Sequence, residues 1–190
     1  MTLPTPAATR TLICRAVLFD MDGTLVDSTA VVEQVWGEFA ARYSLDIAEI
    51  LRTSHGVQAG ATELLRSLPA DAVALVTSAD RILADIRMEA AGLAMPATAV
   101  TADLVTQGKP HPEGYLTAAA LLGVEPEDAV VFEDAPAGIA AGVAAGIRTV
   151  AVGPNTGELP AGVLHIPDYT AVTASVEVDA AGRRVISFHL

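Results

Sequence analysis

The feature that most constrains the fold is a short apolar run, residues 16–19, that ends in two carboxylates, Asp20 and Asp22. Four consecutive apolar residues are typical of a parallel strand that is buried on both faces. Because an unpaired carboxylate is expensive to bury, the strand has to deliver both acids to an edge that is open to solvent or holds a cation. Gly23 then allows a sharp turn, and Thr24 adds a hydroxyl beside the acids. In open parallel α/β sheets, this edge is where ligands bind.

Downstream of this run, predicted strands and helices alternate, as they do along a parallel α/β sheet. The predicted strands are 72–76, 99–102, 129–132, 149–152 and 163–166, and the predicted helices are 31–43, 61–68, 81–91, 112–122 and 137–145. Near the end, residues 175–179 and 183–188 alternate apolar and polar side chains around a turn, which predicts an antiparallel hairpin. The expected fold is therefore α/β, a three-layer sandwich around a mainly parallel, Rossmann-like sheet with a C-terminal β-hairpin.

Composition narrows the class of protein. The 190 residues suit one domain, and the net charge of −12 argues against nucleic acid or an anionic membrane as a partner. Charged residues or glycine interrupt every apolar stretch, so no membrane span is expected. Residues 1–11 lack a basic head before an apolar core, which predicts a mobile tail on a cytoplasmic protein rather than a signal peptide. Cys14 is the single cysteine; it excludes an internal disulfide and is expected to be a packing residue at the start of the first strand.

Polar residues follow four of the predicted strands or their loops. They are Asp20 and Asp22, Thr77 and Ser78, Lys109, and Glu133 and Asp134. If the strands are parallel, all of these side chains lie at one edge of the sheet. Several carboxylates at one point repel each other unless a divalent cation lies among them, and a set of oxygen ligands suits Mg²⁺. An ammonium, a hydroxyl and free backbone N–H groups suit a phosphate. One carboxylate can then attack phosphorus while another transfers protons.

Taken together, four segments resemble the motifs of the haloacid dehalogenase superfamily, in particular its sugar-phosphate phosphatase and β-phosphoglucomutase branch. The segments are Asp20-Met-Asp22-Gly23-Thr24-Leu-Val-Asp27-Ser28, Leu75-Val-Thr77-Ser78, Gly108-Lys109-Pro-His111-Pro112 and Val131-Phe-Glu133-Asp134-Ala-Pro-Ala-Gly138. They occur in the family's order and cover residues 14–155. One such motif is weak, whereas four in order are highly specific.

The resemblance implies a role for each motif residue. Asp20 would be the nucleophile that becomes phosphorylated, and Asp22 the general acid and base, whose backbone carbonyl also binds Mg²⁺. Thr77 and Lys109 would hold the transferring phosphoryl group. The other implied residues are Gly23, Thr24 and Ser78 for phosphate binding, and Asp134 with nearby Glu133 to complete the Mg²⁺ site. Haloacid dehalogenases proper lack the second aspartate, so Asp22 argues for phosphoryl transfer.

Some neighbouring residues have simpler interpretations. Ser78 and Asp80 are suitable N-cap residues for the helix predicted at 81–91. Asp27 and Ser28 are suitable N-cap residues for the helix predicted at 31–43. His111 is expected to be a loop residue, although it lies two positions from Lys109.

Members of this branch usually insert a helical cap between the first and second motifs, and that cap selects the substrate. Thr24 and Thr77 lie too close in the sequence for a complete cap. The expected organisation is a tail at 1–11, a core at 12–27 and 61–170, a truncated cap at 28–60 and a hairpin extension at 171–190. A shortened cap should weaken substrate discrimination and slow turnover. It should also expose the apolar residues Val31, Val35, Trp36 and Phe39, which predicts a homo-oligomer formed through this face.

The function that these observations favour is a Mg²⁺-dependent phosphatase, which hydrolyses a small phosphorylated sugar or polyol through an aspartyl-phosphate. Three alternatives stay open at this point. The first is a β-phosphoglucomutase-like phosphotransferase, which would need a lid to keep water from the phosphoenzyme. The second is a weakly active or non-catalytic protein that binds metal and phosphate. The third is a phosphatase whose open site admits a phosphoprotein.

Overall fold

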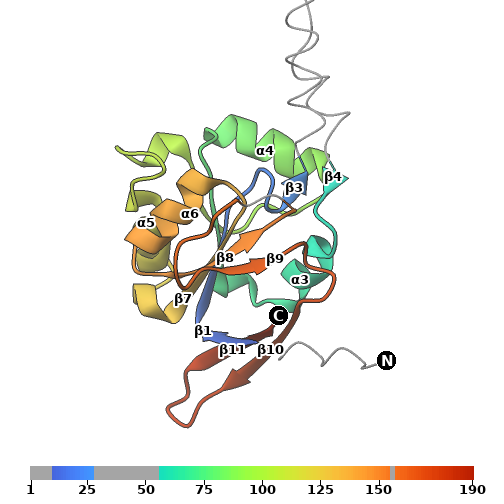
Figure 1. The fold of residues 1–190 in the computed structure, drawn as a ribbon, viewed down its shortest axis with the longest axis vertical. Helices are drawn as coiled ribbons and strands as arrows, with labels where there is room; N and C mark the ends of the chain where they lie inside the picture. The colour runs from blue at the N-terminus through green and yellow to red at the C-terminus, as the bar shows by residue number, and fades with distance from the viewer. Residues whose placement is uncertain (1–9, 28–55, 155–156) are drawn as a thin grey trace, which may run out of the picture.

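The computed structural model describes residues 10–27, 56–154 and 157–190, and its centre is a parallel six-stranded sheet. The strand order is β6-β5-β2-β7-β8-β9, and every neighbouring pair is parallel (Figure 1). The strands are β2 (Ala16–Phe19), β5 (Val73–Val76), β6 (Thr98–Val100), β7 (Ala129–Glu133), β8 (Arg148–Val152) and β9 (Leu164–Ile166). This confirms the predicted fold class.

Strand β2 lies in the middle of the sheet, which explains its uninterrupted apolar sequence. All four of its residues are fully buried, and their side chains alternate between the two faces. Val17 and Phe19 belong to one hydrophobic core, whereas Leu18 belongs to the other. The parallel register pairs Phe19 with Leu75 of β5 and with Phe132 of β7, so the three strands end at the same edge.

Helices cover both faces of the sheet and complete the three layers. Helices α5 (Glu113–Leu121) and α6 (Pro136–Ala144) contribute buried residues to the core that contains Leu18. Helices α3 (Ala61–Ser67) and α4 (Arg81–Ala90) contribute to the core that contains Phe19. Short 3₁₀ turns precede or follow three strands, at η1 (Ala70–Ala72), η2 (Ala102–Leu104) and η3 (Pro126–Asp128). None of the helices that the structure describes is long and apolar enough to cross a membrane.

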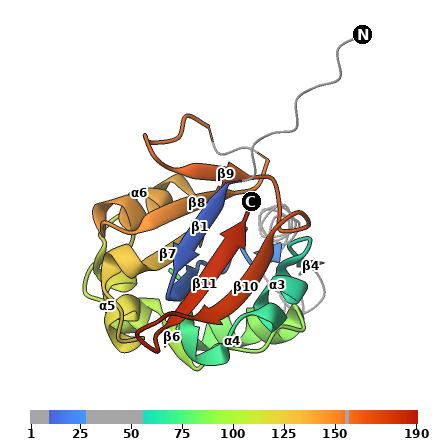
Figure 2. The ribbon, with the colours of Figure 1, turned by 90° about the horizontal axis from the view of Figure 1, so that it is seen from below.

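A second, antiparallel sheet lies below the first in Figure 1 and faces the viewer in Figure 2. Strands β10 (Thr173–Val178) and β11 (Arg184–His189) form the predicted C-terminal hairpin. The sequence did not predict the third strand, β1 (Thr11–Cys14), which pairs with β11. Cys14 therefore ends β1 instead of starting the parallel strand, because the backbone N–H of Arg15 bonds to the carbonyl of Asp128 and separates β1 from β2.

A two-stranded pair follows the first motif. Strand β3 (Val26–Asp27) pairs antiparallel with β4 (Gly56–Val57), and Asp27 lies in this strand. The two strands bracket residues 28–55. The predicted helix at 31–43, the cap at Ser28 and the apolar residues expected to mediate oligomerisation lie outside the described residues.

Candidate active site

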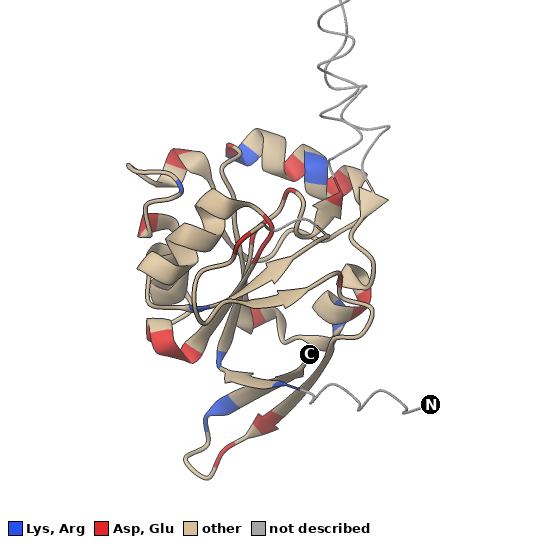
Figure 3. Cartoon of the chain, viewed as in Figure 1, with Lys and Arg blue, Asp and Glu red and all other residues tan. Residues whose placement is uncertain are grey.

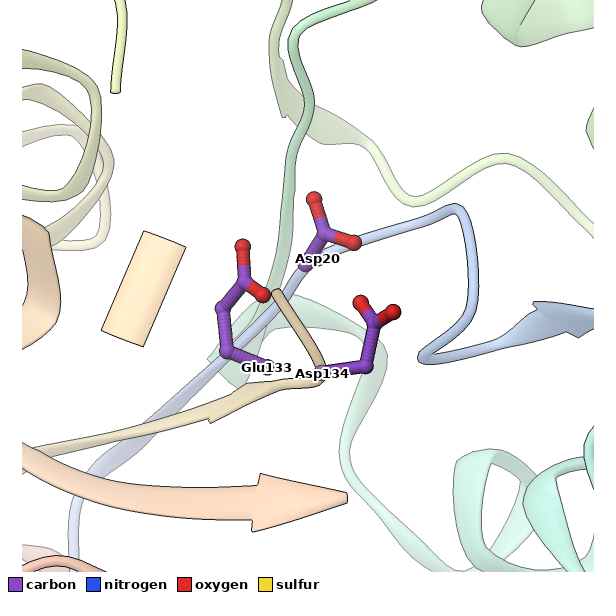
Figure 4. A group of neighbouring side chains, drawn as sticks. All are labelled: Asp20, Glu133 and Asp134. Atoms are coloured by element: carbon purple, nitrogen blue, oxygen red, sulfur yellow. The ribbon is translucent and has the colours of Figure 1, made fainter. Parts of the chain in front are cut away.

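Three predicted acids meet at the carboxyl edge of the six-stranded sheet. Asp20 directly follows β2, Glu133 is the last residue of β7, and Asp134 follows it. One carboxylate oxygen from each lies within 4.8 Å of the others. Figure 4 shows the three side chains rising from two adjacent strand ends toward the same space. Parallel pairing of β2 with β7 is what brings residues so distant in the sequence together.

Lys109 lies between two of these carboxylates. Its Nζ donates to Asp20 Oδ1 at 2.5 Å, to Glu133 Oε1 at 2.6 Å and to the Val76 carbonyl at 3.1 Å. The ammonium also lies over the ring of Tyr115, at 5.1 Å from the ring centroid. The three charged side chains are almost entirely buried. The predicted cation is thus fixed directly beside the predicted nucleophile.

One ammonium does not neutralise three carboxylates, and the electrostatics reflect that excess. Burial, together with the charge of Asp20, raises the pKa of Glu133 to about 7 and the pKa of Asp134 to about 6. Burial alone would lower the pKa of Lys109, but the charges of Asp20 and Glu133 outweigh it and raise that pKa. Additional positive charge at this cluster would therefore stabilise the ionised carboxylates.

Glu133 is held on both of its oxygens. Besides Lys109, Oε1 accepts from the Tyr115 hydroxyl at 3.3 Å, and Oε2 accepts from the backbone N–H of Ala135 at 2.7 Å. Gly138, in the first turn of α6, leaves room for this carboxylate, because a Cβ there would lie 1.6 Å from Oε1. The geometry thus makes Glu133 the partner that positions Lys109, although it belongs to the acidic cluster.

The turn after β2 positions Asp134. The Thr24 hydroxyl donates to Asp134 Oδ1 at 3.0 Å. Gly23 has a φ of +78°, and a Cβ there would lie 2.0 Å from Asp134 Oδ2, so only glycine permits this approach. Gln58, just after β4, donates from Nε2 to the Gly23 carbonyl at 2.8 Å. The described structure thus ties the two strands that bracket residues 28–55 to the acidic edge.

Asp22 lies apart from this cluster. Its Oδ2 accepts a hydrogen bond from Nη1 of Arg87 in α4, and the two side chains form an ion pair. The side chains are 18% exposed for Arg87 and 30% exposed for Asp22. In Figure 3, charged segments of α4 lie above the acidic strand ends.

Thr77, Ser78 and Lys109 line a small pocket whose described lining includes none of the four predicted acids. Thr77 is buried at the end of β5, and its Oγ1 accepts from the Ala79 N–H at 3.0 Å. Thr77, Ser78 and Lys109 border a pocket of about 200 Å³ that also includes His111 of the loop. Asp80 is the N-cap of α4, and its side chain accepts from the Leu83 N–H at 2.8 Å, as predicted.

Sequence reasoning missed three residues that shape the site, namely Arg87, Tyr115 and Gln58, and it included Gly138 in the fourth motif without predicting that this glycine makes room for Glu133. Arg87 carried a weak signal, because helical spacing puts it on the same face as Leu83 and Ala91, which pack against the core. A charge on such a face needs a buried partner. No sequence pattern around Gln58 indicates that it contributes to the site. Its partner is the Gly23 backbone carbonyl, which the pairing of β3 with β4 brings close.

Comparisons with known proteins agree with this geometry. The model of a family described as haloacid dehalogenase-like hydrolases matches residues 14–68 and 43–146. Hexitol phosphatase A of Escherichia coli K12 is 37% identical over 179 residues, which covers 73% of this chain and 83% of that protein. Glycerol-1-phosphate phosphohydrolase 2 of Saccharomyces cerevisiae is 32% identical over 184 residues, covering 72% of this chain and 74% of that protein. The crystal structure of a putative β-phosphoglucomutase from Thermotoga maritima superposes with a TM-score of 0.66 and 25% identity, covering 80% of this chain and 93% of that one.

Proposed function

The chain is a phosphatase of the haloacid dehalogenase-like hydrolase family, and from this premise we propose that its substrate is a small phosphorylated sugar or polyol. Two relatives bear the names of a hexitol phosphatase and a glycerol-1-phosphate phosphohydrolase, which supports this class of substrate.

The observation that carries the proposal is the contact between Asp20 and Lys109. A nucleophilic carboxylate has to approach a phosphate dianion, and an ammonium at 2.5 Å offsets the repulsion between the two anions. Asp20 attacks phosphorus, and the bond from phosphorus to the leaving oxygen breaks as the aspartyl-phosphate forms. Thr77 and Ser78 follow β5, which ends at the same edge of the sheet as β2, and would hold the phosphoryl oxygens.

Asp22 moves the protons in both halves of the reaction. As an acid it donates a proton to the departing alkoxide oxygen of the sugar or polyol. As a base it then takes a proton from the water that attacks the aspartyl-phosphate. That second step releases inorganic phosphate and restores the Asp20 carboxylate.

The donor chemistry of the acidic cluster fits Mg²⁺. The cluster offers carboxylate oxygens only, two of its members have raised pKa values, and a single ammonium offsets only part of its negative charge. Asp20, Asp134 and the backbone carbonyl of Asp22 would hold the ion, while Glu133 stays with Lys109. A bound Mg²⁺ would supply positive charge next to the phosphoryl oxygens.

We further propose that residues 28–60 form a truncated cap. The support for this proposal is the short stretch between the first and second motifs, from Thr24 to Thr77. An open site should discriminate weakly among small substrates and turn over slowly.

The test measures phosphate release from a series of polyol phosphates, sugar phosphates and an aryl phosphate, with Mg²⁺ and with EDTA. We expect release that requires Mg²⁺ and falls to the background level in Asp20→Asn. Release from a phosphopeptide but from none of the small compounds would overturn the proposed substrate class. Transfer of phosphate between positions of one sugar, without release, would instead show a phosphotransferase.

A further inference from the structure

We propose that Arg87 is a positioning residue that holds the Asp22 carboxylate outside the metal-binding cluster and directs it toward the leaving oxygen. This inference rests on the proposed function, in which Asp22 transfers protons. The supporting observation is the ion pair between the Arg87 guanidinium and Asp22 Oδ2, which joins α4 to the turn after β2.

Helix α4 gives the guanidinium a fixed origin. Asp80 caps the first turn, and Ala84 and Met88 are buried against the sheet on either side of Arg87 in the sequence. Helix α4 begins directly after the loop that carries Thr77. The same helix therefore helps to position both this loop and Arg87. Because the helix is anchored, Arg87 can fix the orientation of a side chain in the turn after β2.

Asp22 needs such an anchor because a stronger attraction competes for it. A divalent cation held by Asp20 and Asp134 would draw a third carboxylate from only two residues away in the sequence. The acidic cluster comprises Asp20, Glu133 and Asp134 without Asp22, whose carboxylate is paired with Arg87. Arg87 thus contacts one proposed catalytic aspartate, while Lys109 contacts the other together with Glu133.

The reaction itself supplies a readout that a merely structural role would not change. An alkoxide leaving group needs a proton as it departs, whereas a nitrophenolate is stable without one. The ratio kcat/KM reports the steps up to departure of the leaving group. Misplacing Asp22 should therefore lower kcat/KM for a polyol phosphate far more than for p-nitrophenyl phosphate.

The experiment compares Arg87→Met and Arg87→Lys with Arg81→Met. Arg81 lies on the same helix and forms an exposed ion pair with Asp85, so it controls for loss of a charge from α4. We expect Arg87→Met to lower kcat/KM for glycerol phosphate about tenfold or more, and for p-nitrophenyl phosphate by less than about threefold. Arg87→Lys should recover part of the loss, and Arg81→Met should resemble the wild type. Equal losses on both substrates would overturn the inference.

A thermal double-mutant cycle tests the contact independently of turnover. The cycle consists of wild type, Asp22→Asn, Arg87→Met and the double variant, and each Tm is measured. We expect the double variant to differ from wild type by less than the sum of the two single shifts. Additive shifts would show that the side chains do not interact and would overturn the inference while leaving the proposed function intact. A wild type that releases no phosphate from either substrate would instead refute the proposed function, and the inference with it.

Discussion

At the carboxyl edge of the parallel sheet, the buried side chains include Asp20, Thr77 and Glu133, whereas the antiparallel sheet at the other end buries Cys14, Ile186 and Phe188. Both regions are assembled from segments distant in the sequence. The carboxyl edge of the parallel sheet, here called the upper region, joins β2 to β7. The antiparallel sheet, here called the lower region, joins β1 to β11. The upper region concentrates like charges, which costs folding free energy, while the lower region buries apolar area, which stabilises the fold. We therefore expect substitutions above to change rate and substitutions below to change stability.

The strongest test of this division is Asp20→Asn. We expect phosphate release to fall to the background level because the amide cannot attack phosphorus. The Tm should not fall, since the change removes one charge from a cluster of three carboxylates around one ammonium. Measurements of phosphate release and thermal unfolding on one preparation test both halves of the prediction. Asp71→Asn, which removes an ion pair with Arg184 of β11, is the matched control and should keep full activity. A large fall in Tm for Asp20→Asn would show that the charged edge also supports the fold.

Phe188→Ala tests the lower region. Phe188 is fully buried in β11 and packs edge-on against Phe132, with ring centroids 5.4 Å apart. Loss of the ring should lower the free energy of unfolding by about 3–5 kcal/mol, measured by urea denaturation. Val178→Ala in the same sheet is the control, because Val178 is 69% exposed and should change that free energy by less than about 0.5 kcal/mol. Phe132 directly precedes Glu133, so a loss of kcat in the folded Phe188→Ala protein would show that the two regions are coupled.

The sequence predicted the upper region well for a physical reason. A buried parallel strand that ends in Asp20 has little choice but to place the acid at an edge, and three further strands or loops ended in polar residues. The structure brings Asp20, Lys109, Glu133 and Asp134 together as that pattern requires. The partners that orient them were harder to predict. Tyr115 donates a hydrogen bond to Glu133 from a separate helix, which leaves no local pattern in the sequence, and the fourth motif contains Gly138 without any sign that it makes room for the Glu133 carboxylate.

In the lower region, the sequence predicted the hairpin but not its third strand. Alternation of apolar and polar residues marked β10 and β11, and in β11 the alternation matches the buried Ile186 and Phe188, whereas β10 is largely exposed. Strand β1 is only four residues long and is separated from β2 by Arg15 alone, so Thr11 was expected in the tail and Cys14 at the start of the parallel strand. The pairing of β3 with β4 was missed for a similar reason, since two residues are too few to show a period.

Gly138→Ala should disturb the upper region without removing any charge. A Cβ would lie 1.6 Å from Glu133 Oε1, so the carboxylate has to move away from Lys109. We expect a fall in kcat together with a loss of about 1–3 kcal/mol in stability from the overpacking. Gly108→Ala is the control for a small residue near the site, because a Cβ at Gly108 would meet no atom within 4 Å. Unchanged kcat in Gly138→Ala would mean that the pairing of Glu133 with Lys109 does not contribute to the reaction.

The smallest expected effect is a change in the rate at which the Cys14 thiol is labelled. This measurement reports on opening of the lower region without any substitution. Burial raises the pKa of the Cys14 thiol to about 12, so at pH 8 almost no thiolate is available and the native protein should react slowly with a disulfide reagent. The rate should rise when β1 detaches, because the unfolded strand exposes a thiol with an ordinary pKa. If this opening is local to the edge strand, saturating Mg²⁺ and phosphate at the other end should leave the labelling rate unchanged. If labelling requires global unfolding, the same ligands should slow it in proportion to the stability they add. Slower labelling would therefore show that the two regions unfold as one unit, although one contains the candidate active site and the other contributes apolar packing.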